Sequence, residues 1–266
     1  MILSDQEFDF LRKLLYEAAG INLNTEKKAL VVGRLSRRIE KLGLSSYGEY
    51  FRRIAGKLDQ DERQWALDAL TTNETSFFRE PEHFAFLSET ILPAVRYGET
   101  FRIWSAASSS GEEAYSIAMV LAEHLGKGEW EVVASDLSTK VLDQARRAHY
   151  PMARAGKIPQ PYLRAYCLKG IDEQEGTFLI DGWLRSRVRF LQANLMEPLP
   201  SVGQFDVIFL RNVLIYFDAP TKIRVVNNLL PFLKPGGHFF SGHSESLIGL
   251  IEGLQPIKPA IYRMAA

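Results

Sequence analysis

The chain has 266 residues, of which 46% are hydrophobic and 11% aromatic, enough to bury a substantial core. Lys plus Arg and Asp plus Glu each total 32, so no overall charge draws the protein to nucleic acid or to a membrane surface. The single Cys167 excludes an internal disulfide, and no apolar run approaches the roughly 18 residues of a membrane-spanning helix. With acids where a signal peptide would be basic, these features predict a cytoplasmic protein that is not membrane-inserted and binds no nucleic acid.

The first 75 residues predict a small all-helical domain. Ser4 and Glu7 have the spacing of a capping box, which begins a first helix that ends at Gly20. A second helix is expected over residues 26–42, and the same capping-box spacing from Ser46 begins a third.

Beyond residue 100, short apolar runs alternate with helical patterns, which predicts strand–helix–strand units around a largely parallel sheet. Core strands are expected at residues 101–106, 131–135, 188–192, 205–210 and 238–242. Helices are expected at residues 112–125, 138–148 and 221–234. A stretch from 151 to 186, interrupted by prolines and glycines, predicts a small antiparallel insert at the edge of the sheet.

Small side chains fill the loop over residues 105–111, after the first expected strand. At the carboxyl end of a parallel strand and the start of a helix, such a loop lets a ligand lie against the backbone, although a tight turn would look the same. Only Gly111 is present, so this is not the three-glycine dinucleotide fingerprint. Glu112 and Glu113 at the helix start would repel a pyrophosphate and favour a cationic group such as an amino-acid ammonium.

An acidic residue, Asp136, closes the second apolar strand. A carboxylate at this place can accept both hydroxyls of a ribose, as in other nucleoside-binding folds. The alternative is that Asp136, or Ser138 beside it, only caps the following helix. Glu113 and Asp136 together favour a nucleoside that bears an amino acid over a dinucleotide.

Five segments of the sequence match the motifs of one protein family. They are TTNETSFFRE at 71–80, SSGEEAYS at 109–116, NL at 194–195, FLRNVLIYFD at 209–218 and GHSES at 242–246. By these segments, and over nearly its whole length, the chain resembles the CheR family of chemotaxis receptor methyltransferases. The resemblance implies an α/β fold class. A small all-helical domain over 1–75 would recognise the receptor, and 76–100 would form a linker that lines the cofactor. A Rossmann-like methyltransferase domain over 101–266 would carry the β subdomain at about 151–186.

The resemblance implies transfer of a methyl group from S-adenosylmethionine to glutamate side chains on the cytoplasmic domain of chemotaxis receptors, with S-adenosylhomocysteine as product. It places Glu113 at the methionine amino group and Asp136 at the ribose. The residues that it implies for the whole cofactor site are Asn73, Thr75, Arg79, Glu113, Asp136, Asn194, Leu195, Arg211 and Asn212. Arg79 and Tyr216 would lie nearest the reacting methyl and act as the catalytic residues.

Methylating a glutamate needs no general base, because a carboxylate with a pKa of about 4.3 is already ionised near neutral pH. We therefore expect Arg79 and Tyr216 to orient donor and acceptor. Arg79 could instead form an ion pair with Glu80 or Glu82, and Tyr216 could simply pack in the core.

The sequence departs from the family pattern at Ser108 and Leu210, where many members carry Cys. Neither position is expected to carry the chemistry. The five histidines show no metal-ligand spacing and are expected at the surface or at helix caps, so no metal is predicted.

A basic stripe lies on the second expected helix. Arg34, Arg37, Arg38 and Lys41 follow the i, i+3, i+4, i+7 spacing beside an apolar stripe. A solvated helix face is the alternative. Charge and family resemblance together favour docking of acidic, glutamate-bearing receptor helices, so these four residues are the candidate substrate-binding set.

The insert offers a second possible receptor contact. Residues 177–180 and 184–188, on either side of Gly182, are expected to be extended, and an exposed strand edge can add a partner peptide. The related family holds a receptor's C-terminal tail in this manner, but here the loop between Gly170 and Gly176 is acidic rather than glycine-rich. A purely structural flap is the alternative.

Two other functions compete with methyl transfer. A nicotinamide-dependent oxidoreductase would share the α/β pattern and Asp136, but the glycine fingerprint is missing. An inactive module that keeps the cofactor fold would not need Arg79 and Tyr216. The chain is expected to be a monomer.

Overall fold

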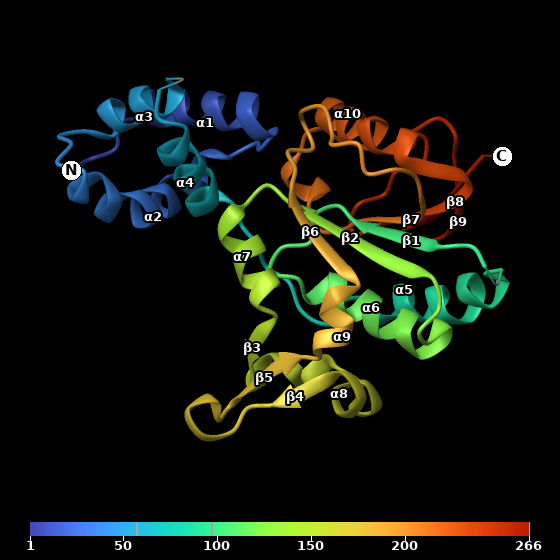
Figure 1. The fold of residues 1–266 in the computed structure, drawn as a ribbon. Helices are drawn as coiled ribbons and strands as arrows, with labels where there is room; N and C mark the ends of the chain where they lie inside the picture. The colour runs from blue at the N-terminus through green and yellow to red at the C-terminus, as the bar shows by residue number, and fades with distance from the viewer. Residues whose placement is uncertain (57, 97, 266) are drawn as a thin grey trace.

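The computed structural model describes residues 1–56, 58–96 and 98–265. Its N-terminal part is a helical bundle made of α1 (Asp5–Ala19), α2 (Lys28–Lys41), α3 (Tyr47–Ala55) and α4 (Gln60–Leu70) (Figure 1). The predicted capping box of Ser4 and Glu7 is confirmed, and Ser46 accepts the Glu49 amide at 3.1 Å. The apolar faces of the four helices meet in a core separate from that of the sheet, as predicted for a helical domain.

The rest of the chain is built around a seven-stranded sheet in the order β6-β2-β1-β7-β8-β10-β9. Its strands are β1 (Phe101–Ser105), β2 (Trp130–Asp136), β6 (Val188–Gln192), β7 (Phe205–Leu210), β8 (Leu233–Ser241), β9 (Leu254–Lys258) and β10 (Ile261–Met264). The five predicted strands are confirmed and pair in parallel, whereas β10 runs antiparallel to β8 and β9. The sequence did not predict β9 and β10, and β8 begins earlier than expected, at Leu233.

Helices cover both faces of this sheet. They are α5 (Pro81–Phe86), α6 (Glu112–Leu125), α7 (Thr139–Arg147) and α10 (Ala219–Leu229), with short turns at Leu87–Ile91 and Leu92–Ala94. Figure 1 shows α5 and α6 below the sheet and α10 above it. The segment 76–100, predicted as a linker, therefore contains helical structure whose Phe84 and Leu87 pack into the same core as β1. The predicted helix over 221–234 ends at Leu229, followed by a 3-10 turn over Leu230–Phe232 that contains Pro231.

The insert forms its own antiparallel sheet in the order β3-β5-β4, from β3 (His149–Pro151), β4 (Cys167–Lys169) and β5 (Thr177–Ile180). It projects away from the main sheet (Figure 1) and also carries α8 (Gln160–Tyr166) and α9 (Gly182–Ser186). The prediction that residues 184–188 are extended is wrong for residues 184–187, because the Asp181 side chain accepts the Trp183 amide and starts α9, which ends at a helical C-cap at Arg187. Within the described residues, none of the helices combines the length and the apolar character that crossing a membrane requires.

Candidate active site

The strand order reverses between β1 and β7, and open parallel sheets bind their ligands beyond the carboxyl ends of the strands at such a point. The predicted site residues follow the ends of these strands. Glu113 comes after β1, Asp136 ends β2, Asn194 follows β6, and Arg211 and Asn212 follow β7. The topology therefore collects side chains that are distant in sequence at one edge of the sheet.

A cavity of about 430 Å³ lies at this edge, between the helical domain and the sheet. All ten residues that the resemblance assigns to the cofactor or the chemistry line it: Asn73, Thr75, Arg79, Glu113, Asp136, Asn194, Leu195, Arg211, Asn212 and Tyr216. The helical domain adds lining residues that the sequence did not indicate, among them Ile21, Asn22 and Lys27 from the segment between α1 and α2. Gly20 predicted where α1 ends, but nothing in the sequence analysis predicted that the following segment reaches the pocket.

Arg211 is the centre of a buried charge cluster on the wall of this pocket. Its Nη1 donates to Glu113 Oε2 at 2.8 Å and its Nη2 to Glu80 Oε2 at 3.0 Å. Ser105 donates to the other oxygen of Glu113 at 2.7 Å. Burial raises the pKa of Glu113, whereas at Glu80 the charge of Arg211 and the amide of Asn212 outweigh burial and lower the pKa. Two carboxylates thus share one guanidinium, so with both carboxylates ionised the three groups carry a net negative charge, which favours a cationic ligand group near Glu113.

The Asp136 carboxylate is held by backbone amides. Ser109 N–H donates to Oδ2 at 2.8 Å and Ser138 N–H to Oδ1 at 2.9 Å. Burial raises the pKa of Asp136. Neither Asp136 nor the Ser138 side chain caps α7, since Asp136 bonds to the amide of the N-cap residue itself and Ser138 makes no capping hydrogen bond. The capping alternative is therefore wrong, and the carboxylate remains at the pocket wall.

Arg79 and Tyr216 lie at the same pocket. Arg79 donates to the Glu74 carbonyl at 3.1 Å, and within the described residues no ion pair joins it to Glu80 or Glu82. Tyr216 is only half-buried, with burial as the main cause of its raised pKa and the Glu74 carboxylate as the next. Its side chain borders the pocket as well as the core, so the core-packing alternative describes only part of its surroundings.

Glu245 supports the loop that carries Arg211, Asn212 and Tyr216. This buried carboxylate accepts the amides of Asn212 at 2.8 Å, Ile215 at 3.1 Å and Gly242 at 2.7 Å. A Cβ at Gly242 would lie 2.6 Å from Glu245 Oε2, so the position requires glycine. Sequence reasoning included Glu245 only within the GHSES motif and assigned it no role.

The basic stripe on α2 divides into two parts. Arg34 donates to the Leu70 and Thr71 carbonyls at 3.0 and 2.9 Å, and Arg38 forms a salt bridge of 2.5 Å with buried Glu62. These two arginines therefore hold α2 against α4. Arg37 and Lys41 are exposed.

His83 is fully buried, so the expectation that every histidine lies at the surface or at a cap is wrong for this residue. Glu80, His83 and His243 place ligand atoms within 4.8 Å of one another, a cluster that sequence spacing did not indicate. Both oxygens of Glu80 already accept hydrogen bonds, from Arg211 on one side and from Asn212 on the other. A cation here would have to displace the guanidinium, and absence of a metal remains our prediction.

Ser108 and Leu210, the two departures from the family pattern, are buried behind the site and do not belong to the pocket lining. Neither touches the cavity in which the chemistry would occur. The pocket's lining residues, in the ranges that the structure describes, include neither His nor Cys.

The strand order, the pocket at the strand ends and the acidic side chains around it are typical of a Rossmann-like domain that binds a nucleoside-containing cofactor. A family model described as "CheR methyltransferase, SAM binding domain" matches residues 73–261, and one described as "CheR methyltransferase, all-alpha domain" matches residues 6–71. The chain therefore belongs to the CheR family of S-adenosylmethionine-dependent methyltransferases.

Curated relatives extend this similarity over nearly the whole chain. "Chemotaxis protein methyltransferase 2" of Pseudomonas aeruginosa is 40% identical over 263 residues, which cover 98% of this chain and 93% of that protein. "Chemotaxis protein methyltransferase" of Salmonella typhimurium is 40% identical, with 100% and 92% covered. Among solved structures, the N-methyltransferase NodS from Bradyrhizobium japonicum in complex with S-adenosylhomocysteine is 15% identical with a TM-score of 0.42, covering 82% of this chain and 97% of that one.

Proposed function

We propose that this enzyme transfers the methyl group of S-adenosylmethionine to glutamate side chains on the cytoplasmic domain of chemotaxis receptors, for adaptation in chemosensory signalling. We expect it to act in the cytoplasm as a monomer. The observation that supports the proposal most directly is the interdomain pocket, where the buried carboxylates of Glu113 and Asp136 line one cavity together with Arg79 and Tyr216.

The residues of the pocket fit the cofactor. Glu113, which shares its guanidinium partner with Glu80, suits the methionine ammonium, and Asp136 suits the two ribose hydroxyls. Asn194 and Leu195 would frame the adenine. When bound, S-adenosylmethionine supplies an electrophilic methyl group on a positively charged sulfur.

In the proposed mechanism the protein positions reactants and excludes water. The acceptor carboxylate is already ionised near neutral pH, which agrees with a pocket wall that, among the described residues, offers no imidazole or thiol. Arg79 and Tyr216 would orient donor and acceptor for in-line transfer, for which good alignment contributes at best about 7–11 kcal/mol. The segment between α1 and α2 closes the pocket on the helical side and would limit access of water.

Labelled methyl transfer to a receptor cytoplasmic domain tests the proposal. Wild-type enzyme should incorporate label that mild alkali releases as methanol, as expected for a glutamate methyl ester. A receptor domain with Gln in place of the candidate glutamates is the matched control. Absence of label, or label that survives alkali, would contradict glutamate methylation.

The exposed part of α2 is the proposed dock for the receptor's acidic helices. Arg37→Glu with Lys41→Glu should raise the KM for the receptor in a salt-dependent way without loosening α2, because neither side chain is buried. The control is Arg96→Glu with Lys127→Glu, which makes the same charge change just before β1 and β2, at the opposite ends of the strands. Equal KM values for the two double variants at low salt would remove α2 from the receptor surface.

A receptor tail could add to the outer edge of β4. β5 is the middle strand and has no free edge, so the tether proposal moves from residues 177–180 to Cys167–Lys169. The Tyr166 carbonyl and the Gly170 amide form backbone hydrogen bonds on the side that faces β5. Because these directions alternate along an antiparallel strand, the amide of Lys169 points to the free edge. Lys169→Pro should abolish binding of a cognate tail peptide and leave S-adenosylhomocysteine binding intact. If no cognate tail binds the wild-type enzyme, receptor recognition rests on the helical domain.

A further inference from the structure

Helix α7 receives its N-terminal cap from the other domain. Ser138 occupies the N-cap position, but its hydroxyl is buried and makes no hydrogen bond within the described residues. Asp68 of α4 takes its place, because its Oδ1 accepts the Thr139 amide at 3.0 Å and its Oδ2 accepts the Thr139 hydroxyl at 2.7 Å and the Lys140 amide at 3.3 Å. A carboxylate of the helical domain thus satisfies the orphan amides of a helix in the methyltransferase domain.

The same surface of α4 also holds the loop that precedes α7. Gln64 donates to the Leu137 carbonyl at 3.0 Å and to Asp68 Oδ1 at 2.8 Å. Gln192 donates to Gln64 at 2.9 Å and to the same Leu137 carbonyl at 3.2 Å. The Leu137 side chain packs against the core of the helical bundle. The loop over 136–138 is therefore attached to α4 by a side chain, a carbonyl and a helix cap.

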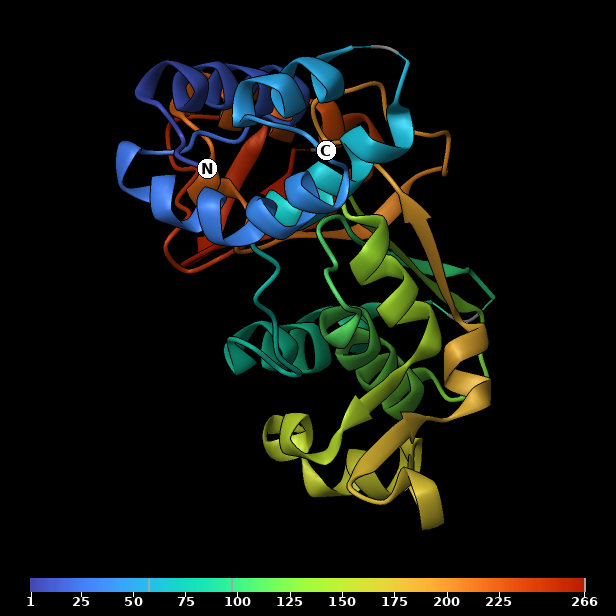
Figure 2. The ribbon, with the colours of Figure 1, turned by 90° about the vertical axis from the view of Figure 1, so that its left-hand side faces the viewer.

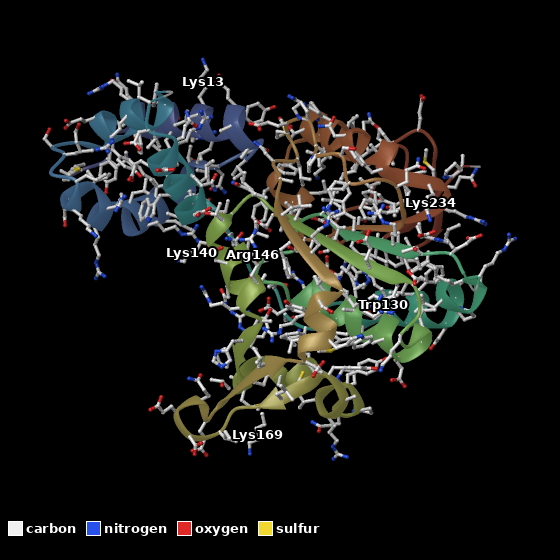
Figure 3. All side chains as sticks on the ribbon, viewed as in Figure 1. Lys13, Trp130, Lys140, Arg146, Lys169 and Lys234 are labelled. Atoms are coloured by element: carbon white, nitrogen blue, oxygen red, sulfur yellow. The ribbon has the colours of Figure 1, made fainter. Side chains whose placement is uncertain are left out.

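Asp136 begins this loop, and the Ser138 amide supplies one of the two hydrogen bonds that orient its carboxylate, the other coming from Ser109. Figure 2 shows α4 against the start of α7, and Figure 3 labels Lys140 at the same junction. We propose that Asp68 is a positioning residue for cofactor binding, which fixes the loop so that Asp136 faces the ribose. This rests on the proposed role of Asp136 in binding that ribose.

Removing the cap should weaken binding without removing any contact to the cofactor. The uncapped loop would be ordered in only a fraction of molecules, and the apparent affinity falls by that fraction. A lost N-cap shifts a local equilibrium by about fivefold, so Asp68→Ala should raise the Kd for S-adenosylhomocysteine by up to about fivefold, the full value applying when the uncapped loop is mostly disordered. Asp68→Asn keeps a carbonyl oxygen for the Thr139 amide and should restore most of the affinity. Asp61→Ala, an exposed carboxylate on the same helix, is the matched control and should have no effect.

A double-mutant cycle distinguishes positioning from a general structural role. Asp136→Ala alone should raise the Kd by about tenfold or more. If Asp68 acts through Asp136, the double variant should bind as Asp136→Ala does, because a loop without its carboxylate gains nothing from being fixed. Calorimetry on variants with a verified melting temperature supplies the Kd values.

Each outcome decides the matter. An unchanged Kd in Asp68→Ala, or effects of Asp68→Ala and Asp136→Ala that multiply in the double variant, would overturn the positioning role. An unchanged Kd in Asp136→Ala would instead overturn the ribose role itself, so the two failures are distinguishable. Should Asp68→Ala not fold, Thr139→Val removes only the 2.7 Å hydroxyl bond to Oδ2, and the same cycle with Asp136→Ala applies.

Discussion

Glu113→Gln removes one buried negative charge from the pocket while keeping the shape of the side chain. Ser105 can still donate to the remaining oxygen, and Arg211 keeps its 3.0 Å contact with Glu80, so the fold should persist. The cofactor would lose its charge-assisted hydrogen bond to the carboxylate. Such bonds contribute about 1.5–3 kcal/mol, so affinity for S-adenosylhomocysteine should fall by roughly 10- to 150-fold.

Two ligands separate the role of Glu113 from that of Asp136. 5′-Methylthioadenosine keeps the adenine and ribose of S-adenosylhomocysteine but lacks the amino-acid part. Glu113→Gln should therefore weaken only S-adenosylhomocysteine, whereas Asp136→Ala should weaken both ligands by about tenfold or more. Titration calorimetry of each variant with each ligand gives four Kd values, which are compared with those of the wild-type enzyme.

The pattern can fail in two informative ways. Equal weakening of both ligands by Glu113→Gln would mean that the charge cluster shapes the pocket rather than binding the ammonium. No weakening of either ligand by Asp136→Ala would remove Asp136 from the cofactor site. Lowering the pH offers a check, because burial raises the pKa of both carboxyls: wild-type affinity should fall at a higher pH than exposed Asp and Glu carboxyls would give.

Three further predictions concern turnover and stability. Tyr216→Phe should lower kcat at nearly unchanged cofactor affinity, and a higher receptor KM at unchanged kcat would assign Tyr216 to substrate binding instead. Arg211→Met should lower the free energy of unfolding in urea by about 3–5 kcal/mol, because buried Glu113 and partly buried Glu80 lose their counter-charge. A loss below about 1 kcal/mol would mean that these ion pairs stabilise the fold no more than exposed surface pairs do. Burial lowers the pKa of His83 from 6.5 to about 3, so below pH 6.5 the unfolded chain takes up a proton that the folded chain does not. Stability from this group should fall by about 1.4 kcal/mol between pH 7.5 and 5.5, and a His83→Phe variant that keeps the wild-type pH dependence would contradict this.

The sequence predicts the parallel strands of the sheet well and its antiparallel edge, β9 and β10, poorly. β7 was predicted with its observed bounds because it is almost wholly buried and forms a nearly continuous apolar run. β6 was also predicted with its observed bounds, although two of its five residues are exposed. β9 has one buried residue in five and contains Pro256, so its sequence shows neither an apolar run nor the alternation of apolar and polar residues that is typical of a strand. α9 was missed because a local hydrogen bond from the Trp183 amide to the Asp181 carboxylate decides its start, against the β-like composition around it.

The site residues were predicted through short motifs, but their partners were not. Motifs name Glu113 and Arg211 separately, and only the fold shows that they pair across 98 residues of chain. Asp68 reaches Thr139 across 71 residues from a helix that the sequence analysis did not predict. Each such contact depends on how two domains pack, and no local pattern of the chain encodes that packing.

The two halves of the basic stripe should differ in their effect on the cofactor. Arg38 faces α4 through its 2.5 Å bond to Glu62, and α4 holds the Asp136 loop, so Arg38→Ala should both destabilise the bundle and weaken S-adenosylhomocysteine binding. Arg37 and Lys41 face solvent, and their charge reversal should leave that Kd unchanged while the receptor KM rises. Calorimetry on both variants measures the contrast. A weaker cofactor affinity in the Arg37 and Lys41 variant would mean that the charges of these two residues act on the pocket through their electrostatic field. An effect through packing would require contact with α4.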